Sequence, residues 1–278
     1  MSKIGIQHPG EMGVSIGASA LRGGHEVFWI PNDRSAKTRS RAQKHALIEV
    51  ESLSALCRTC EIIISICPPH AAEAVSDRTI ANGFRGIYLD ANAISPERAI
   101  KMSEKMELNG IHFVDGGIIG GPAWETKATW LYLSGKDANK IADCFSNGPL
   151  ETKIIGDKPG KASALKMCYA AHSKGTTALL CAVLGTAESL GVRAELYQHW
   201  DIDEKDYSDQ ANRRVMRATA RAWRFEAEMR EIESTFRAAG IPDGFHAASA
   251  EIYHRMADFK DASQQPELDD VLRALQGS

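Results

Sequence analysis

The first half of the sequence alternates short apolar runs with stretches that suit helices, and this alternation restricts the possible fold more than any other feature. The apolar runs are KIGI (3–6), EVFWI (26–30), EIIISIC (61–67), GIYLD (86–90), HFVDG (112–116) and TWLYLSG (129–135). The helical stretches between the early runs are 14–22, 36–45, 71–77 and 97–107. Short continuous apolar strands separated by helices are typical of a mostly parallel sheet that is covered on both faces. We therefore expect an α/β domain with a doubly wound sheet over residues 1–155.

The second half carries a different pattern. Beyond about residue 155 the strand signal stops, and long amphipathic patterns predict helices at 161–190, 194–200, 209–239 and 245–257. Gly191, Gly240 and Gly277 stand where such helices would end. The first expected helix is far longer than the mean of roughly 11–12 residues, so it should join the two halves. Residues 156–278 are expected to form an all-helical second domain.

Charge and composition argue against several classes of partner. The 33 basic and 36 acidic residues give a formal net charge of -3, which makes no electrostatic case for nucleic acid or an anionic membrane. The opening MSKIGI lacks the apolar core of a signal peptide, and no apolar segment reaches membrane-spanning length. The six scattered cysteines fit a reducing compartment, so we expect a cytoplasmic protein. Cys57 and Cys60 form a CxxC without a second ligand pair, and no metal is expected.

The turn after the first expected strand resembles a phosphate-binding loop. HPGEMG (8–13) lies between a strand and a helix, which is the context of the G-x-G-x-x-G dinucleotide fingerprint. Gly10 and Gly13 fill the second and third glycine places, and His8 stands in the first. Because helix N–H groups would face the phosphates, we expect Gly10, Glu11, Met12 and Gly13 to bind the cofactor of a Rossmann-type domain. An ordinary strand-to-helix turn is the alternative.

The residues after the second strand bear on the choice of cofactor. A carboxylate here would bind the ribose 2′-hydroxyl of NAD(H), and Asp33 is available for that. Guanidinium and hydroxyl groups would bind the 2′-phosphate of NADP(H), and PNDRSAKTRSRA (31–42) supplies more of these. We therefore favour NADP(H) over NAD(H); the alternative is a solvated basic helix start. The residues expected to bind the cofactor in this segment are Asn32, Arg34, Ser35 and Thr38.

Two lysines stand in the apolar stretch GKASALKMCYAAHSKGTTALL (160–180). Lys166 and Lys174 are eight residues apart, a little over two helical turns, so their side chains would project in nearly the same direction. This spacing predicts a helix that lines a polar cavity. The alternative is that both lysines reach solvent from the rim of a packed helix.

Five motifs together resemble the β-hydroxyacid dehydrogenase family, which includes 3-hydroxyisobutyrate dehydrogenase and 6-phosphogluconate dehydrogenase. They are HPGEMG (8–13), SICPPH (65–70), DANAISP (90–96), DGGIIGGP (115–122) and GKASALKMCYA (160–170), in the family's order and at similar spacing. The resemblance covers the whole chain, in particular to a branch with a phosphogluconate dehydrogenase-like helical C-terminal domain. It implies a homodimer joined through the helical domains.

The resemblance implies a role for each motif. Lys166 falls on the family's catalytic lysine, a general acid or base that settles the proton of the substrate oxygen when a hydride moves. Cys67, Pro68 and Pro69 belong to the nicotinamide-side loop, and the amide of Asn92 could hold the nicotinamide or the substrate. The glycine-rich segment would bring backbone N–H groups to a carboxylate of a small-molecule substrate. Its expected substrate contacts are Gly117, Gly120 and Gly121.

Departures from the family concern the substrate. Ala170 occupies the place of an asparagine that binds the substrate hydroxyl, and Tyr169 or Lys174 could replace it. The small 3-hydroxy acids usual for the family are therefore in question. Trp124 follows the glycine segment and either walls a pocket for a larger compound or packs against the fold. His246 stands at the start of the last predicted helix, and we expect it to face solvent.

These features predict an NADP(H)-dependent oxidoreductase that interconverts a hydroxy acid and its oxo acid or semialdehyde. A lysine ordinarily holds its proton at neutral pH, which favours the reductase direction. Imine reduction on the same scaffold is a second hypothesis, although relatives of that kind generally lack the lysine. A third is a non-catalytic dinucleotide-binding sensor, against which the retained Lys166 and glycine segment count.

Overall fold

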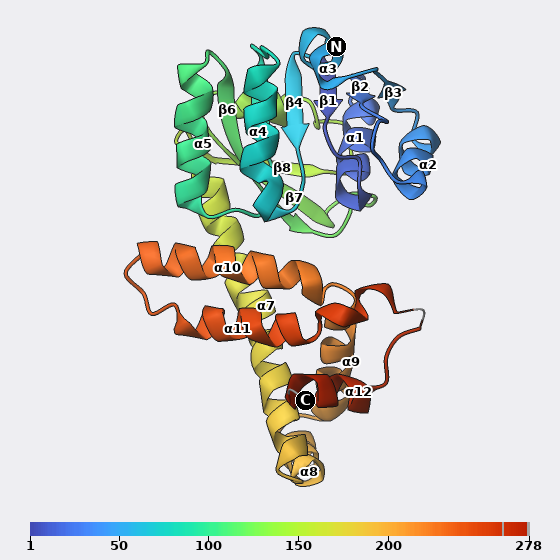
Figure 1. Ribbon diagram of the computed structural model, residues 1–278, viewed down its shortest axis with the longest axis vertical. Coiled ribbons are helices and arrows are strands. Elements are labelled where there is room, and N and C mark those ends of the chain that lie inside the picture. The colour runs from blue at the N-terminus through green and yellow to red at the C-terminus, as the bar shows by residue number, and fades with distance from the viewer. Residues whose placement is uncertain (263, 277–278) are drawn as a thin grey trace. The chain divides into compact units, whose positions relative to one another are not determined.

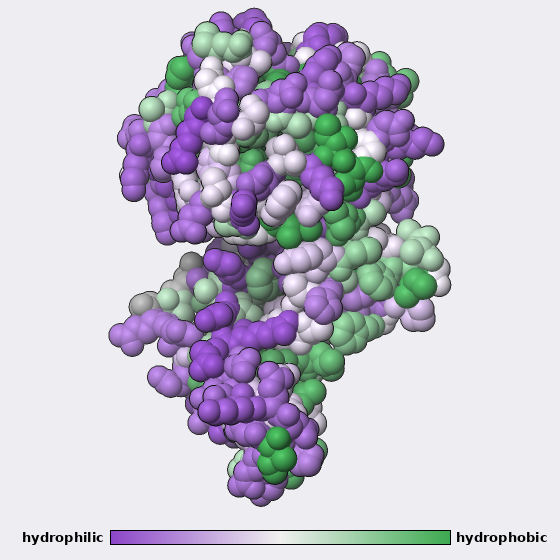
Figure 2. All heavy atoms as spheres, turned by 180° about the vertical axis from the view of Figure 1, so that it is seen from behind, coloured by the Kyte–Doolittle hydropathy of each residue, from purple (hydrophilic) through white to green (hydrophobic). Residues whose placement is uncertain are grey.

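The structure is a computed structural model that describes residues 1–262 and 264–276. It consists of two compact units, one of residues 1–167 and one that begins at Cys168 (Figure 1). The helix stop expected at Gly277 lies outside the described residues. None of the described helices combines the length and the hydropathy of a membrane span. Hydrophilic side chains cover much of one face of each unit in Figure 2.

The first unit is built on an eight-stranded sheet of order β3-β2-β1-β4-β5-β6-β7-β8. Every neighbouring pair is parallel except β6 with β7. The expected doubly wound, mostly parallel sheet is confirmed. The strands are β1 (Lys3–Ile6), β2 (Glu26–Trp29), β3 (Ile48–Glu49), β4 (Ile62–Ser65), β5 (Ile87–Asp90), β6 (His112–Gly120), β7 (Thr129–Ser134) and β8 (Glu151–Gly156).

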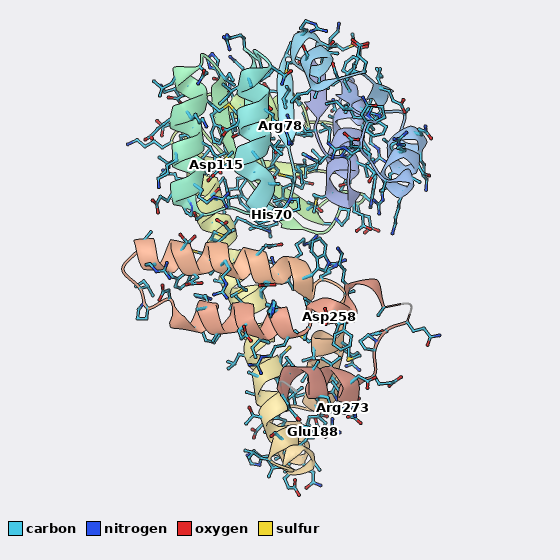
Figure 3. The ribbon with its side chains drawn as sticks, viewed as in Figure 1. His70, Arg78, Asp115, Glu188, Asp258 and Arg273 are labelled. Atoms are coloured by element: carbon cyan, nitrogen blue, oxygen red, sulfur yellow. The ribbon has the colours of Figure 1, made fainter. Side chains whose placement is uncertain are left out.

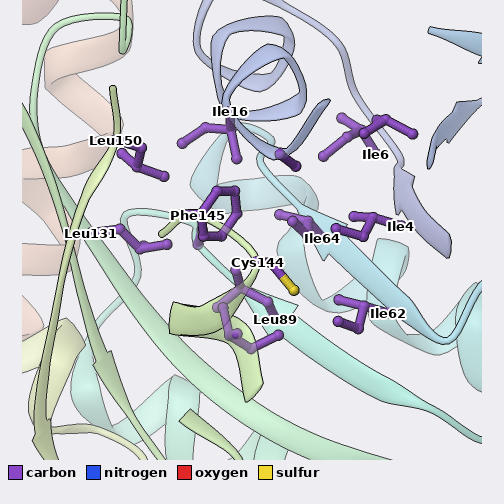
Figure 4. Close-up of a cluster of buried hydrophobic side chains, with 14 of the residues drawn as sticks. Ile4, Ile6, Ile16, Ile62, Ile64, Leu89, Leu131, Cys144, Phe145 and Leu150 are labelled. Atoms are coloured by element: carbon purple, nitrogen blue, oxygen red, sulfur yellow. The ribbon is translucent and has the colours of Figure 1, made fainter. Parts of the chain in front are cut away.

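Helices cover both faces of this sheet because its central strands are apolar on both sides. In β4, Ile62 and Ile64 belong to one buried cluster, whereas Ile63 belongs to the cluster on the opposite face. The first cluster, shown in Figure 4, joins Ile4 of β1 to Ile16 on the adjoining helix. The helices of this unit are α1 (Glu11–Arg22), α2 (Ala36–Lys44), α3 (Leu53–Thr59), α4 (Ala72–Ala81), α5 (Pro96–Leu108) and α6 (Ala138–Asp143).

The second unit contains only helices within its described residues, as expected. Helix α7 (Lys161–Ser189) begins in the first unit and continues into the second. Helices α10 and α11 pack together through fully buried side chains, among them Met229, Ile232 and Tyr253. The remaining elements are α8 (Arg193–Asp203), α9 (Tyr207–Thr219), α10 (Ala222–Ala238), α11 (Gly244–Arg255), the short 3-10 helix η2 (Ala257–Asp261) and α12 (Leu268–Gln276).

Several boundaries differ from the prediction. The single helix expected at 209–239 is two, since α9 ends at Thr219 and α10 begins at Ala222. Neither Gly nor Pro marks this break; the Thr219 hydroxyl donates to Met216 O at 2.8 Å and satisfies a carbonyl at the end of α9. Strand β8 was not predicted because its side chains are half-buried or exposed, as befits an edge strand. The short elements β3, α3 and α6 were missed as well, and so was α12.

Candidate active site

The turn between β1 and α1 has the close packing that a dinucleotide loop requires. A Cβ atom on Gly13 would lie 2.1 Å from His8 O, so only glycine lets α1 start this close to the end of β1. A Cβ atom on Gly10 would meet nothing within 4 Å, which leaves open space above the turn. The N–H groups in the first turn of the 12-residue helix α1 face its N-terminal end. This end of α1 can accept a phosphate.

Polar atoms gather beside this turn without partners. Gln7 Oε1, His8 Nδ1 and Arg34 Nε are buried, and none of them has a hydrogen-bond partner among the described residues. Arg34 is held in place because its Nη2 donates to Gln7 O at 2.9 Å. Three unsatisfied buried atoms beside an open glycine turn fit a polar ligand that bonds to them. The residues present therefore fit the phosphate-bearing end of a dinucleotide.

The electrostatics of this corner favour an anion. Burial and the positive charges of Arg34 and Arg78 lower the pKa of His8 to about 4, so its ring is neutral at neutral pH. Burial and Arg78 also lower the pKa of Arg34. Arg78 lies on α4 and is labelled in Figure 3. Sequence reasoning missed Arg78 because nothing local connects it with a turn seventy residues earlier.

The segment after β2 forms the start of α2. Ser35 caps this helix by accepting a hydrogen bond from Thr38 N at 3.2 Å, and the two hydroxyls lie 3.1 Å apart. Asn32 Nδ2 donates to Glu51 O at 2.8 Å. Asp33 occupies the left-handed region with φ 59°, which lets the chain reverse between β2 and α2. Arg34, which follows it, reaches back to the end of β1.

The loop SICPPH (65–70) is tied to the end of β5 by Asn92. Its Oδ1 accepts from Cys67 N at 2.5 Å, and its Nδ2 donates to Asp90 Oδ2 at 2.7 Å and to Ser65 Oγ at 3.2 Å. Burial raises the pKa of Asp90 to about 7, opposed by the hydrogen bonds from Asn92. Pro69, which is buried, begins the short 3-10 helix η1 (Pro69–Ala71), and Pro68 precedes it. The Asn92 amide thus fixes the loop through Oδ1 and joins the ends of β4 and β5 through Nδ2.

The glycine segment at the end of β6 allows α7 to lie directly against the sheet. A Cβ atom on Gly117 would lie 2.6 Å from Ala162 O and 3.2 Å from Lys166 Cβ. Gly120 has φ 124°, in a region that other residues rarely adopt. A Cβ atom on Gly121 would meet nothing within 4 Å, so the backbone there is open to an approaching group. The segment thus places the backbone of β6 beside the first turns of α7.

Lys166 is half-buried, and its Nζ donates to Ile118 O at 2.6 Å. The start of its helix is fixed by the buried carboxylate of Asp115, labelled in Figure 3. Asp115 Oδ2 accepts from Gly160 N at 2.8 Å and from Ser163 N at 3.0 Å, and Oδ1 accepts from Ser163 Oγ at 2.6 Å. A third donor to Oδ2 is Ser134 Oγ at 3.0 Å. One helical turn separates Ser163 from Lys166, so Asp115 positions the lysine.

Sequence reasoning did not identify Asp115 as a positioning residue. The available signal was a carboxylate at the end of an apolar strand run, immediately before two glycines. A carboxylate in such a place is buried, and a buried carboxylate needs several donors. The donors come from residues 134–163, which only the folded chain brings together.

The other expected substrate contacts are distributed over both units. Trp124 is 40% exposed, and its ring stacks on His45 with centroids 4.6 Å apart. Tyr169 is 50% exposed in the second unit. Lys174 forms an ion pair with Glu228 of α10.

The prediction that His246 faces solvent is wrong. The residue is 5% exposed, and its ring centroid lies 4.1 Å from that of Phe236. The cause is the packing of α11 on α10, which encloses the first turn of α11. Burial lowers the pKa of His246, opposed by Asp243.

The cysteines offer no activated nucleophile in this unit. Burial raises the pKa of Cys57 to about 11 and that of Cys60 to about 12. Burial also raises the pKa of Cys67 to about 11, opposed by Ser65. Thiols with such values stay protonated at neutral pH. No group of three or more His, Cys, Asp and Glu side chains suited to a metal ion occurs in residues 1–262 and 264–276.

Comparison with known proteins gives matches over both units. Residues 3–146 match the NAD binding domain of 6-phosphogluconate dehydrogenase, and residues 187–256 match a domain of unknown function, DUF1932. An uncharacterised 28.5 kDa protein of Methanothermus fervidus is 32% identical over 210 residues, which cover 75% of this chain and 80% of that protein.

Solved structures share the fold along most of the chain. The conserved protein MTH1747, of unknown function, superposes with a TM-score of 0.67 at 27% identity, covering 93% of this chain and 98% of that one. Mycobacterium tuberculosis 3-hydroxyisobutyrate dehydrogenase has a TM-score of 0.71 at 18% identity, covering 99% of both chains. A reductive aminase of Aspergillus terreus, solved with NADPH, has a TM-score of 0.59 at 14% identity, covering 98% and 99%. The last two likenesses concern the fold alone.

Proposed function

The chain belongs to the β-hydroxyacid dehydrogenase family of NAD(P)-dependent oxidoreductases that act on CH–OH groups, and from this premise we propose that it is an NADP(H)-dependent enzyme with Lys166 as general acid and base. It interconverts a hydroxy acid and its oxo acid or semialdehyde. The cofactor supplies or accepts the hydride. The substrate is a small molecule that carries a carboxylate.

The observation that carries this proposal is the placement of Lys166. Its Nζ donates to Ile118 O at 2.6 Å beside the glycine segment of β6, and Asp115 fixes the start of its helix. A lysine ammonium ordinarily holds at neutral pH the proton that carbonyl reduction consumes. The lysine therefore protonates the substrate oxygen during reduction and removes that proton during oxidation. Help of this kind typically contributes about 10²–10⁴-fold to the rate.

Arg34 supports NADP(H) as the cofactor. Its guanidinium is held by Gln7 O, and its buried Nε has no partner among the described residues. A 2′-phosphate supplies negatively charged acceptors for such a group, whereas a ribose hydroxyl supplies a single uncharged acceptor. Ser35 and Thr38 add hydroxyls at the start of α2, and Gly10 to Gly13 provide the turn for the pyrophosphate.

The remaining residues of the proposal shape the substrate side. Gly120 and Gly121 present backbone at the open end of β6 to the substrate carboxylate. Cys67, Pro68 and Pro69 form the loop next to the nicotinamide, and Asn92 ties this loop to the end of β5. Trp124, Tyr169 and Lys174 remain predicted substrate contacts.

We also infer that the protein acts as a homodimer through its helical unit. Leu190 is 70% exposed and Ile202 is 77% exposed there, and Leu179 of α7 is 51% exposed. Apolar side chains left this open in one unit suit a twofold interface. Sedimentation velocity at micromolar concentration should give a dimer, and a monomer would contradict the inference.

Replacing Lys166 with methionine tests the function. The panel comprises oxo acids, semialdehydes and one cyclic imine, each with NADPH and with NADH. Lys166→Met should bind NADPH as the wild type does and lose turnover of the oxo compounds, because methionine keeps the unbranched stem of the side chain without the ammonium group and its proton. Lys161→Met, an exposed lysine on the same helix, is the matched control and should keep full turnover.

Three results would count against the proposal. Unchanged turnover in Lys166→Met would remove the lysine from the mechanism. Turnover of the imine alone would favour the imine reductase hypothesis, and failure of the wild type with every compound would favour the sensor hypothesis.

A further inference from the structure

A cavity of about 560 Å³ lies within the helical unit, lined by side chains of α7, α9, α10 and α11 and of the turn between α9 and α10. We propose that it binds a small organic anion with two or more negative charges and an apolar body. The cavity has room for a compound of that size. Its lining belongs entirely to the second unit. The lining includes Lys174, a predicted substrate contact, but not Lys166, so the proposal does not depend on the chemistry of Lys166.

The lining is strongly basic. Lys174, Arg213, Arg214, Arg217 and Arg221 line the cavity, and none of the Asp or Glu residues that the structure describes does. Five positive groups around one small volume set up a field that favours anions. A lining of this composition repels a cation and gains no electrostatic attraction from a neutral apolar ligand.

Among the described residues, an acidic side chain balances only one of these charges. Lys174 pairs with Glu228, a buried residue whose Oε1 also lies 3.4 Å from Arg224 Nε. Arg214 is fixed by neutral acceptors instead: its Nε donates to Thr177 Oγ1 at 2.7 Å and its Nη2 donates to Ser173 O at 3.0 Å. Arg214 is thereby oriented without losing its charge.

The other three arginines form no ion pair within the described part of the chain. Arg213 and Arg217 are four residues apart on α9, and Arg221 follows four residues later in the turn before α10. Like charges at this spacing destabilise a helix. An anion between them would remove the repulsion, and guanidinium groups bind carboxylate or phosphate oxygens with two parallel hydrogen bonds.

The cavity also has an aromatic wall, formed by Tyr207, Phe225 and Tyr253. Phe225 and Tyr253 meet edge to face with ring centroids 5.3 Å apart, and the Tyr253 hydroxyl donates to Lys174 O at 2.8 Å. An apolar body on the ligand would pack on these rings while its charged groups reach the arginines. The ligand class is therefore an aryl or alkyl phosphate or a di- or tricarboxylate.

The experiment titrates the full chain with phenyl phosphate, phthalate, inorganic phosphate and phenol by isothermal titration calorimetry. Saturable binding of phenyl phosphate or of phthalate is expected, and the stronger of the two identifies the anionic group as phosphate or carboxylate. Inorganic phosphate should bind more weakly than phenyl phosphate, because it leaves the aromatic wall uncovered. Phenol, which has the ring without the charge, should not bind.

Arg217→Ala should weaken the binding of whichever organic anion binds more tightly to the wild type, by about tenfold or more. Two controls should keep the wild-type affinity. Arg273→Ala removes an exposed arginine of the same unit outside the cavity, and Arg34→Ala removes the arginine beside the dinucleotide turn. Because Arg217→Ala also relieves like-charge repulsion, its melting temperature without ligand should match or exceed that of the wild type. Lost affinity therefore cannot be ascribed to misfolding.

Four results would overturn the proposal. The first is that Arg217→Ala and Arg273→Ala bind the organic anion with equal affinity, and the second is that Arg34→Ala loses this affinity instead. The third is that none of the three anions saturates the protein. The fourth is that the wild type is a dimer and Arg217→Ala is a monomer. The last result would mean that a second copy of the chain fills the cavity.

Discussion

Replacing Gly117 with alanine tests whether α7 must lie directly against β6. The new Cβ atom would stand 2.6 Å from Ala162 O and 3.2 Å from Lys166 Cβ. The first of these contacts is with a backbone carbonyl, which cannot turn aside as a side chain can. An ordinary contact between carbon and a carbonyl oxygen is about 3.3–3.6 Å, so the first turn of α7 has to move outward by about 0.7–1 Å.

That movement has two measurable costs. The hydrogen bonds of Asp115 hold Gly160 and Ser163 in place, so the shift strains them, and overpacking of this kind typically costs about 1–3 kcal/mol of unfolding free energy. A catalytic group displaced by about 1 Å can lose about 10²-fold in rate. Gly117→Ala should therefore lower kcat by about 10–10²-fold while NADPH affinity is unchanged. Urea titration, steady-state kinetics and NADPH binding measure the three quantities.

Gly244→Ala is the matched control, because a Cβ atom there would meet nothing within 4 Å. Its stability and turnover should equal those of the wild type. If Gly117→Ala keeps both the wild-type unfolding free energy and the wild-type kcat, the close contact between α7 and β6 does not position Lys166.

The remaining predictions concern single polar groups. Asp115→Ala leaves four donors buried without an acceptor and should lower the unfolding free energy, measured by urea titration, by about 4 kcal/mol or more. Asp115→Asn should fold and show a reduced kcat. A fully active Asp115→Ala would contradict the positioning role of Asp115. Arg34→Ala should weaken NADPH binding by about tenfold or more and leave NADH binding unchanged. Lys37→Ala, which removes an exposed lysine of α2, is the control. An equal loss of affinity for both cofactors would count against NADP(H) preference. The pKa of Asp90 is raised from 3.8 to about 7 in the folded protein. Between these pH values the folded protein keeps a proton on Asp90 that the unfolded chain releases. The stability that this proton contributes is therefore fully present below pH 4 and is lost as the pH rises to 7, by up to about 4 kcal/mol. Unfolding measured from pH 5 to pH 8 should show a flatter profile in Asp90→Asn than in the wild type, and parallel profiles would refute this.

The sheet was predictable because its strands are apolar on both sides and are separated by helices of ordinary length. Strand β4 is the clearest example, since Ile62, Ile63 and Ile64 are buried alternately on the two faces. Edge strand β8 lacks that signal, because only a strand buried on both faces must be apolar throughout. The break between α9 and α10 was missed because Thr219, Ala220 and Arg221 resemble residues of a continuous helix.

The backbone geometry of the candidate site was predictable where a local motif requires a close backbone approach. Gly13 against His8 O and Gly117 against Ala162 O are contacts of that kind. Contacts between distant segments could not be predicted, because one sequence does not show which side chains meet. Arg78 near His8 and the donors of Asp115 are the main examples. His246 was mispredicted for the same reason, since its burial depends on how α11 packs on α10.

The central claim is that Lys166 exchanges a proton with the substrate oxygen, and a single-turnover measurement tests it most directly. Wild type and Lys166→Met are loaded with one equivalent of NADPH, mixed with the best substrate of the panel, and followed by the absorbance of the reduced nicotinamide. We predict equal NADPH binding and a first turnover that is about 10²–10⁴-fold slower in Lys166→Met. A first turnover at the wild-type rate would contradict the claim.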